Sequence, residues 1–275
     1  MASLPARAPV LTSRQQAVSV YDQDDEKDEP VKIKYALFML VLLTSALTPL
    51  AQDSPQVISE DIAVLSDEQA YQSYLAYPAP EGVYPAVVLI HSFNGLQDGY
   101  RDMTDAFAAE GFVVLAIGWQ TFERSPADVL VEQLLRDSIA FLSARDDVDP
   151  TKIGLTGFCA GGRYTMLFMP QIKEFAAGVA WYGFPNFGSP AAPVDVIDQL
   201  DAPMLIIHGT LDRPSPIADI YAYATALGEA GKDFELKVYS NEPHGFMLED
   251  GELSRDDVAT DAFNEMLTYF RRKLG

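Results

Sequence analysis

The single cysteine of the chain lies in the stretch GFCAGGR, residues 157–163, with glycine two residues before it and two residues after it. Gly157 to Gly161 fits the pattern G-x-[S/C]-x-G, which places a nucleophile on a sharp turn between a strand and a helix. Such a turn strains the backbone of the nucleophile, and glycine removes the conflict with neighbouring elements. We therefore predict that Cys159 is a nucleophile. The competing interpretation is a small buried cysteine that happens to have glycine neighbours.

Two further residues have the chemistry to serve this nucleophile. Asp212 lies in HGTLDRP, after the expected strand PMLIIHG, and His244 lies in NEPHGF, after the expected strand FELKVYS. In open α/β sheets the active site lies at the carboxyl ends of the strands. The order nucleophile, acid, histidine is the order of the α/β-hydrolase triad. We therefore expect Cys159, Asp212 and His244 to form a catalytic triad.

Each member of this triad has a distinct expected role. His244 takes the proton of the thiol or holds a thiolate as an ion pair, and Asp212 orients the imidazole. The helix that begins at Ala160 favours the thiolate through its N-terminus. An oxyanion hole needs two N–H groups, one of which we assign to Ala160. The second comes from the stretch HSFNGL, where we choose Phe93 with Ser92 as the near alternative.

Buried strands and amphipathic helices alternate along the chain and must position these residues. Continuous apolar runs predict strands buried on both faces, whereas the first two strands are expected to be short edge strands. This alternation indicates βαβ units and a mostly parallel sheet with helices on both faces, in one α/β domain over residues 52–275. The expected strands cover 61–65, 71–78, 84–90, 112–118, 151–157, 176–183, 203–209 and 234–240; the expected helices cover 99–111, 125–145 with a Ser125 cap, 160–169, 215–230 and 255–273.

The charge of the chain limits its partners. Lys and Arg total 19 against 40 Asp and Glu, which gives a net charge of −21. Nucleic acid and anionic membrane surfaces are therefore not expected as partners, because both require a basic face. An anionic substrate also meets a repulsive field unless the pocket carries its own Arg or Lys. A single cysteine excludes an internal disulfide, and three widely separated histidines do not predict a zinc site.

Residues 31–51, VKIKYALFMLVLLTSALTPLA, have the pattern of a secretory signal peptide. Two lysines precede a mostly apolar stretch at 35–47, and small residues follow up to Ala51. The apolar stretch is short for a membrane span, although a membrane anchor is the alternative interpretation. Cleavage after Ala51 leaves a secreted or periplasmic domain without stable membrane association.

Thirty residues precede this leader, far more than a signal peptide normally carries. They include the acidic run DQDDEKDE at 22–29. We interpret residues 1–30 as a mis-called extension, with translation starting at Val31, or as a disordered tail.

The stretches GFCAGGR, HGTLD and PHGF, with HSFNGL upstream, resemble the dienelactone hydrolase family over roughly residues 60–273. The resemblance implies an α/β-hydrolase fold, no cofactor, and hydrolysis of lactones or small esters. It also implies catalytic roles for Cys159, Asp212 and His244, with the backbone of Phe93 and Ala160 as the oxyanion hole.

The chain departs from the family pattern at two positions. Ser92 stands where family members often carry a glutamate that pairs with the resting thiol. Leu248 stands where the dienelactone-specific members carry an arginine that binds the substrate carboxylate, although Arg124 is a candidate for a second such arginine. Together with the charge of −21, these departures favour neutral small esters or lactones over an anionic dienelactone.

Several side chains beside the triad are candidates for substrate contact. We expect two of the four aromatic candidates to line the acyl pocket, since all four lie on the functional side of the sheet. We expect His91 to brace the oxyanion loop, His208 to be packed with its hydrogen bonds satisfied, and Arg163 to form a structural ion pair. The substrate-binding candidates are Ser92, Trp119, Arg124, Tyr182, Phe184 and Phe246.

The predicted function is thus a carboxylic ester hydrolase that acts on a small-molecule ester or lactone through a thioester acyl-enzyme. Thioester hydrolysis or acyl transfer on the same triad is the first alternative. A non-catalytic binding protein that retains the fold is the second. The sequence assigns neither the natural ester nor an oligomeric state.

Overall fold

One eight-stranded sheet runs through residues 56–275, the part of the chain that the computed structural model describes. Its strand order is β1-β2-β4-β3-β5-β6-β7-β8, in which β1, β2 and β4 pair antiparallel and all other neighbours pair parallel. The strands are β1 (Val57–Ser66), β2 (Gln69–Pro78), β3 (Tyr84–Ile90), β4 (Val113–Ile117), β5 (Val148–Phe158), β6 (Ala177–Trp181), β7 (Met204–Gly209) and β8 (Phe234–Tyr239). The prediction of a mostly parallel sheet is confirmed.

The apolar runs occupy the interior strands for the expected reason. All residues of β4, β6 and β7 are buried, because helices cover these strands on both faces. The prediction that β2 is an edge strand is wrong, since β2 lies between β1 and β4. Its buried Ser73 hydroxyl donates to the Tyr71 carbonyl and accepts from the Gly118 N–H, so a polar residue is accommodated inside the sheet.

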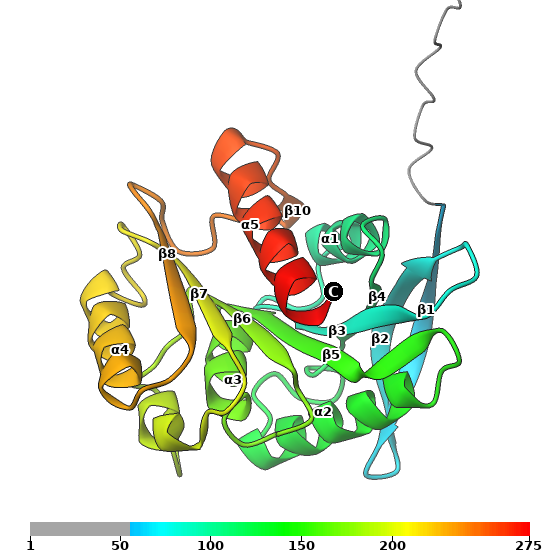
Figure 1. Cartoon of the computed structure of the whole chain (residues 1–275), viewed down its shortest axis with the longest axis horizontal. Helices are drawn as coiled ribbons and strands as arrows, with labels where there is room; N and C mark the ends of the chain where they lie inside the picture. Colours follow the sequence, from blue (N-terminus) through cyan, green and yellow to red (C-terminus); the bar gives the residue numbers. More distant parts are fainter. Residues whose placement is uncertain (1–55) are drawn as a thin grey trace, which may run out of the picture. The chain divides into compact units, whose positions relative to one another are not determined.

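Five helices cover the two faces of the sheet (Figure 1). On one face, α1 (Asp98–Ala108) and α5 (Asp257–Leu274) enclose an apolar cluster with the sheet. On the other face, α2 (Asp128–Ser143), α3 (Ala160–Phe168) and α4 (Ile217–Glu229) enclose a second cluster. The sequence did not predict the 3-10 segment η1 (Pro193–Gln199) or the hairpin of β9 (Leu248–Glu249) and β10 (Glu252–Leu253).

Helix α2 does not begin with the predicted Ser125 cap. It starts at Asp128, with Ala127 in the capping position and no side-chain cap. Ala127 has an extended backbone, and residues 125–127 line a pocket, so this segment serves the site rather than the helix. Helix α5, by contrast, is capped by Asp256, whose carboxylate accepts from the Ala259 N–H at 2.7 Å.

The predicted leader at 31–51 and the preceding residues 1–30 lie outside the described residues. Within residues 56–275, none of the helices combines the length and the apolar character that crossing a membrane requires.

Candidate active site

Cys159 lies on a strained turn between β5 and α3. Its backbone has φ 59° and ψ −110°, in the positive-φ region that non-glycine residues rarely adopt. Its N–H donates to the Trp181 carbonyl at 3.1 Å, which ties the turn to the end of β6. Such strain costs about 1–3 kcal/mol and persists only where the surroundings impose it.

Glycines beside Cys159 permit close approach between backbones. A Cβ on Gly161 would overlap the Ile90 carbonyl at the end of β3, and one on Gly162 would overlap the Trp181 carbonyl. Helix α3 therefore begins directly against the ends of β3 and β6, the two strands that flank β5. This contact explains in physical terms why the sequence reads GFCAGG.

Asp212 and His244 meet beside this turn. Asp212 follows β7 and is buried, and its Oδ2 lies 2.7 Å from Nδ1 of His244, which follows β8. The other carboxylate oxygen, Oδ1, accepts from the Ser215 N–H at 2.8 Å. His244 and Cys159 line the same pocket. The structure thus brings together all three residues of the predicted triad.

The charges beside His244 favour its protonated form. Burial of the ring acts to lower its pKa, but hydrogen bonds to Asp212 and Cys159 and the negative charges of both groups outweigh burial and raise the pKa to about 9. An imidazolium therefore lies between a carboxylate and a sulfur. This is the arrangement that an activated cysteine nucleophile requires.

A second histidine contacts the same carboxylate. His208 is fully buried, and its Nε2 lies 2.8 Å from the Ser215 carbonyl and 3.5 Å from Oδ2 of Asp212. A carbonyl oxygen only accepts, so Nε2 carries the proton, while Nδ1 finds no hydrogen-bond partner among the described residues. Burial lowers the pKa of His208, which keeps this ring neutral. His208 is packed as predicted, but only one of its two ring nitrogens has a hydrogen-bond partner among the described residues.

The two predicted oxyanion-hole residues lie on either side of Cys159. Phe93 follows β3 and Ala160 begins α3, and both line a pocket with Cys159. Neither backbone N–H donates to an acceptor within residues 56–275. Two unpaired donors beside a nucleophile suit the binding of a developing oxyanion.

His91 braces this loop as predicted. Its Nδ1 donates to the Ser92 carbonyl at 2.7 Å, and its ring stacks on Trp119 with centroids 5.4 Å apart. The Trp119 indole N–H in turn donates to the His91 carbonyl. Burial lowers the pKa of His91 to about 4, although its bond to Ser92 acts in the opposite direction, so this ring is neutral near pH 7.

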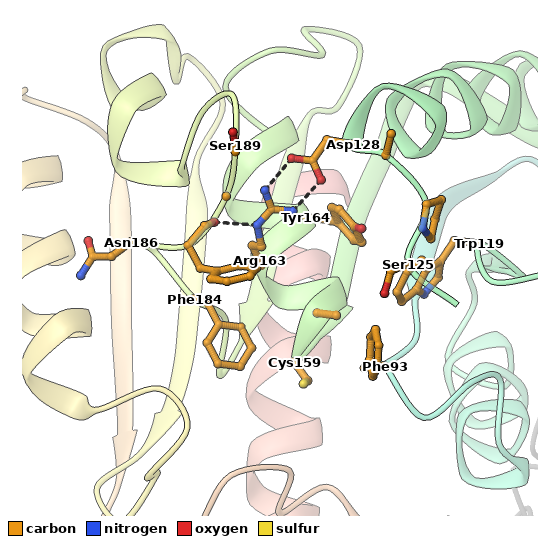
Figure 2. A pocket seen from close by; sticks show the side chains of 15 residues that line it. Phe93, Trp119, Ser125, Asp128, Cys159, Arg163, Tyr164, Phe184, Asn186 and Ser189 are labelled. Atoms are coloured by element: carbon orange, nitrogen blue, oxygen red, sulfur yellow. Dashed lines mark hydrogen bonds and ion pairs between the residues drawn. The ribbon is translucent and has the colours of Figure 1, made fainter. Parts of the chain in front are cut away.

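Two pockets meet at Cys159. The larger has a volume of about 850 Å³ and is lined mainly by apolar and aromatic groups, among them Phe93, Trp119, Tyr164, Phe184 and Phe187 (Figure 2). The smaller has a volume of about 380 Å³ and lies between the loop after β3 and the segment that follows His244. Cys159 is the one residue that lines both pockets in the described part of the chain.

A buried ion pair closes one wall of the large pocket. Arg163 forms a bidentate pair with Asp128 at 2.8 and 2.5 Å, and its Nε donates to the Phe187 carbonyl (Figure 2). The prediction of a structural ion pair is confirmed. Because Arg163 is the only basic side chain among the lining residues of this pocket, the pair leaves no unpaired positive charge there.

The substrate-binding candidates divide between different locations. Trp119 and Phe184 line the large pocket, whereas Tyr182 and Ser92 line the small one. Phe246 lines neither. It packs in the core beside Trp181, Tyr182 and Tyr239, and its position next to the triad in sequence does not bring it to the site because the chain turns inward after Gly245.

Arg124 also lines neither pocket that contains Cys159. It borders an adjoining depression, which shares Phe93 with the large pocket and Asn94 with the small one, and its guanidinium lies over the Phe93 ring at 4.7 Å. The structure therefore does not bring together a basic clamp for a substrate carboxylate at Cys159.

Several lining residues were missed by the sequence analysis. Asp128 and the segment 125–127 follow the carboxyl end of β4, and this position was a usable signal. Residues 186–189, between β6 and η1, and Asp250, in the turn of the β9–β10 hairpin, gave no such signal. Their places depend on the paths of long connections.

Comparisons with known proteins place these features in a family context. The model of the dienelactone hydrolase family matches residues 71–274. A Methylorubrum extorquens protein named "Putative carboxymethylenebutenolidase" is 28% identical over 250 residues, covering 83% of this chain and 86% of the relative.

Solved structures agree with this match. The crystal structure titled as a putative dienelactone hydrolase of Klebsiella pneumoniae has a TM-score of 0.73 at 25% identity, and the alignment covers 79% of this chain and 99% of that one. A dienelactone hydrolase-like promiscuous phosphotriesterase from metagenomic libraries has a TM-score of 0.67 at 17% identity, covering 80% and 99% respectively, and shares the fold.

Proposed function

Because this chain belongs to the dienelactone hydrolase family and is a carboxylic ester hydrolase, we propose that it cleaves neutral small esters or lactones through a Cys159–His244–Asp212 triad. The observation that carries the proposal is the joint placement of these side chains. Cys159 lines one pocket with His244, whose ring Asp212 holds at 2.7 Å, and two unpaired backbone N–H groups lie beside it.

The first half of the reaction forms a thioester. The sulfur of Cys159, as thiolate, attacks the ester carbonyl carbon, and the carbonyl π electrons move to the oxygen, which the N–H groups of Phe93 and Ala160 bind. When the oxyanion collapses, the C–O bond to the alcohol breaks. The leaving oxygen takes the proton from Nε2 of His244 and departs as a neutral alcohol.

The second half restores the enzyme. Neutral His244 removes a proton from water as the water oxygen attacks the thioester carbonyl carbon, and the oxyanion forms again in the same hole. Its collapse breaks the C–S bond, releases the carboxylic acid and returns the sulfur to its pairing with the imidazolium. Asp212 stays ionised throughout and stabilises the charged ring.

The preference for neutral substrates follows from charge. The Arg163–Asp128 pair is internally neutral, the small pocket is lined by Asp250 and by no Lys or Arg, and the chain has a net charge of −21. A carboxylate-bearing substrate would leave water without finding, at either pocket, a cation that is not already paired with a carboxylate.

Hydrolysis of phenyl acetate and of a neutral lactone by the purified chain tests the proposal, beside Cys159→Ala, Cys159→Ser and His244→Ala. The matched control is Thr225→Ala, an exposed position on α4 that lines neither pocket. We expect activity in the wild type and control, its loss in the alanine variants, and an acyl adduct on Cys159 by mass spectrometry after rapid acid quench. Equal activity in wild type and Cys159→Ala would refute the nucleophile assignment.

A further inference from the structure

The two pockets at Cys159 differ in the chemistry of their walls. Apolar and aromatic side chains dominate the large pocket, whose one basic group is neutralised by Asp128. Four residues with hydrogen-bonding side chains, Ser92, Asn94, Gln97 and Asp250, are among those that line the small pocket. One side of the nucleophile therefore suits an apolar group, and the other side suits a group rich in hydrogen-bond donors.

His244 lies on the small-pocket side only. It lines the small pocket and is absent from the lining of the large one, where the oxyanion-hole residues Phe93 and Ala160 lie. The alcohol oxygen must take its proton from His244 as it leaves, and must therefore lie within hydrogen-bond reach of that ring. This requirement places the alcohol part of an ester in the small pocket and the acyl part in the large one.

We propose that the enzyme selects esters of a bulky apolar carboxylic acid with a small hydroxylated alcohol. The acyl group lies in the large pocket, beside Phe93 and Phe184, and the alcohol hydroxyls lie against Asp250 in the small pocket. This inference rests on the proposed ester hydrolysis and specifies its substrate class. The volumes agree with it, since about 850 Å³ accepts an aromatic or branched acyl group and about 380 Å³ accepts a short polyol.

Asp250 is the residue that distinguishes the small pocket. It lies at the tip of the β9–β10 hairpin with a positive φ of 51°. The hairpin is held against the start of α1, because the Gly99 N–H donates to the Gly251 carbonyl at 2.8 Å. As a carboxylate it only accepts hydrogen bonds, so it favours alcohols that donate and repels a carboxylate.

A set of benzoate esters and one reversed ester tests the assignment. Glyceryl monobenzoate, propyl benzoate and carboxymethyl benzoate share the acyl group and differ in the alcohol, while benzyl glycerate exchanges the polar and apolar ends of the ester. We expect kcat/KM to be highest for glyceryl monobenzoate, and at least about tenfold above benzyl glycerate, because reversal puts each end in the wrong pocket.

Two variants assign the effect to the small pocket. Asp250→Asn is expected to lower kcat/KM for glyceryl monobenzoate about threefold to tenfold, to raise it for carboxymethyl benzoate, and to leave propyl benzoate unchanged. Glu249→Gln is the matched control, because it removes the same charge from the same hairpin at an exposed position outside both pockets. It is expected to change none of these ratios.

The outcomes separate this inference from the proposed function. Phenyl acetate hydrolysis that depends on Cys159, combined with equal or reversed preference between glyceryl monobenzoate and benzyl glycerate, would overturn the pocket assignment alone. An identical effect of Asp250→Asn and Glu249→Gln would also overturn it. Failure of every ester, phenyl acetate included, would instead refute the proposed function.

Discussion

Nδ1 of His244 lies 2.7 Å from Oδ2 of Asp212, although the two residues are 32 positions apart in the chain. The carboxylate is buried, and Ser215 holds its second oxygen, so it has little freedom to move away from the imidazole. The geometry fixes which ring nitrogen faces Cys159. Five predictions follow from this relationship and from the contacts around it.

Asp212→Asn is expected to lower kcat by about four orders of magnitude, because an amide neither stabilises the imidazolium nor specifies its tautomer. Ester hydrolysis under saturating substrate measures the effect. Asp201→Asn, an exposed carboxylate on the surface, is the control and should retain wild-type kcat. A loss below tenfold in Asp212→Asn would contradict the triad assignment.

Only one of the three histidines is expected to titrate between pH 7 and pH 10. The pKa of His244 is raised to about 9, whereas burial lowers that of His91 to about 4 and also lowers that of His208. NMR of the imidazole carbons against pH measures all three. In Cys159→Ala the His244 pKa should fall, since a hydrogen bond and a negative charge are lost. An unchanged value would show that the sulfur does not interact with the ring.

The charge on His244 should stabilise the fold in a defined pH window. Its folded pKa of about 9 exceeds the ordinary 6.5, so its contribution is complete below pH 6.5 and is lost as pH rises through about 9. The free energy of unfolding of the wild type minus that of His244→Asn should therefore decrease across this range, by at most about 3 kcal/mol. Urea titrations at several pH values measure it. A difference that stays constant with pH would contradict the shift.

Gly161→Ala is expected to destabilise the fold by about 1–3 kcal/mol and to reduce kcat, because its Cβ would overlap the Ile90 carbonyl and displace the oxyanion loop. Gly228→Ala is the matched control. It lies in α4, where the added Cβ meets nothing closer than 3.9 Å, so it should be neutral or stabilise by about 0.5–1 kcal/mol. Thermal unfolding and kcat measure both. Equal effects of the two substitutions would refute the close approach at the turn.

Asp128→Asn is expected to create a basic site in the large pocket. Arg163 loses its counter-charge, which should cost about 2 kcal/mol of stability. The same change should raise kcat/KM for p-nitrophenyl hydrogen glutarate relative to p-nitrophenyl pentanoate by about tenfold. Glu235→Gln, at the exposed Arg272–Glu235 pair, is the control. It should leave the ratio of kcat/KM for the two substrates unchanged and should alter the free energy of unfolding by no more than about 1 kcal/mol. An unchanged substrate ratio in Asp128→Asn would show that Arg163 does not face the substrate.

The sequence by itself determined the strand–helix alternation and identified the candidate residues of the site. The continuous apolar runs at 84–90 and 204–209 are typical of buried strands, and Cys159, Asp212 and His244 each follow an expected strand. The sharp turn at GFCAGG depends only on residues next to one another in the chain, so the motif predicts it without a structure. These features depend on short-range physics, namely side-chain periodicity and backbone sterics.

Only the tertiary structure decided how the site is divided into two pockets. Arg163 and Asp128 are 35 residues apart, and Asp250 reaches the site on a hairpin that no sequence signal predicted. The same limit explains Phe246, which adjoins the triad in sequence but packs into the core. Pocket walls come from long connections whose paths depend on packing against distant elements, and such contacts leave no periodic pattern in the chain.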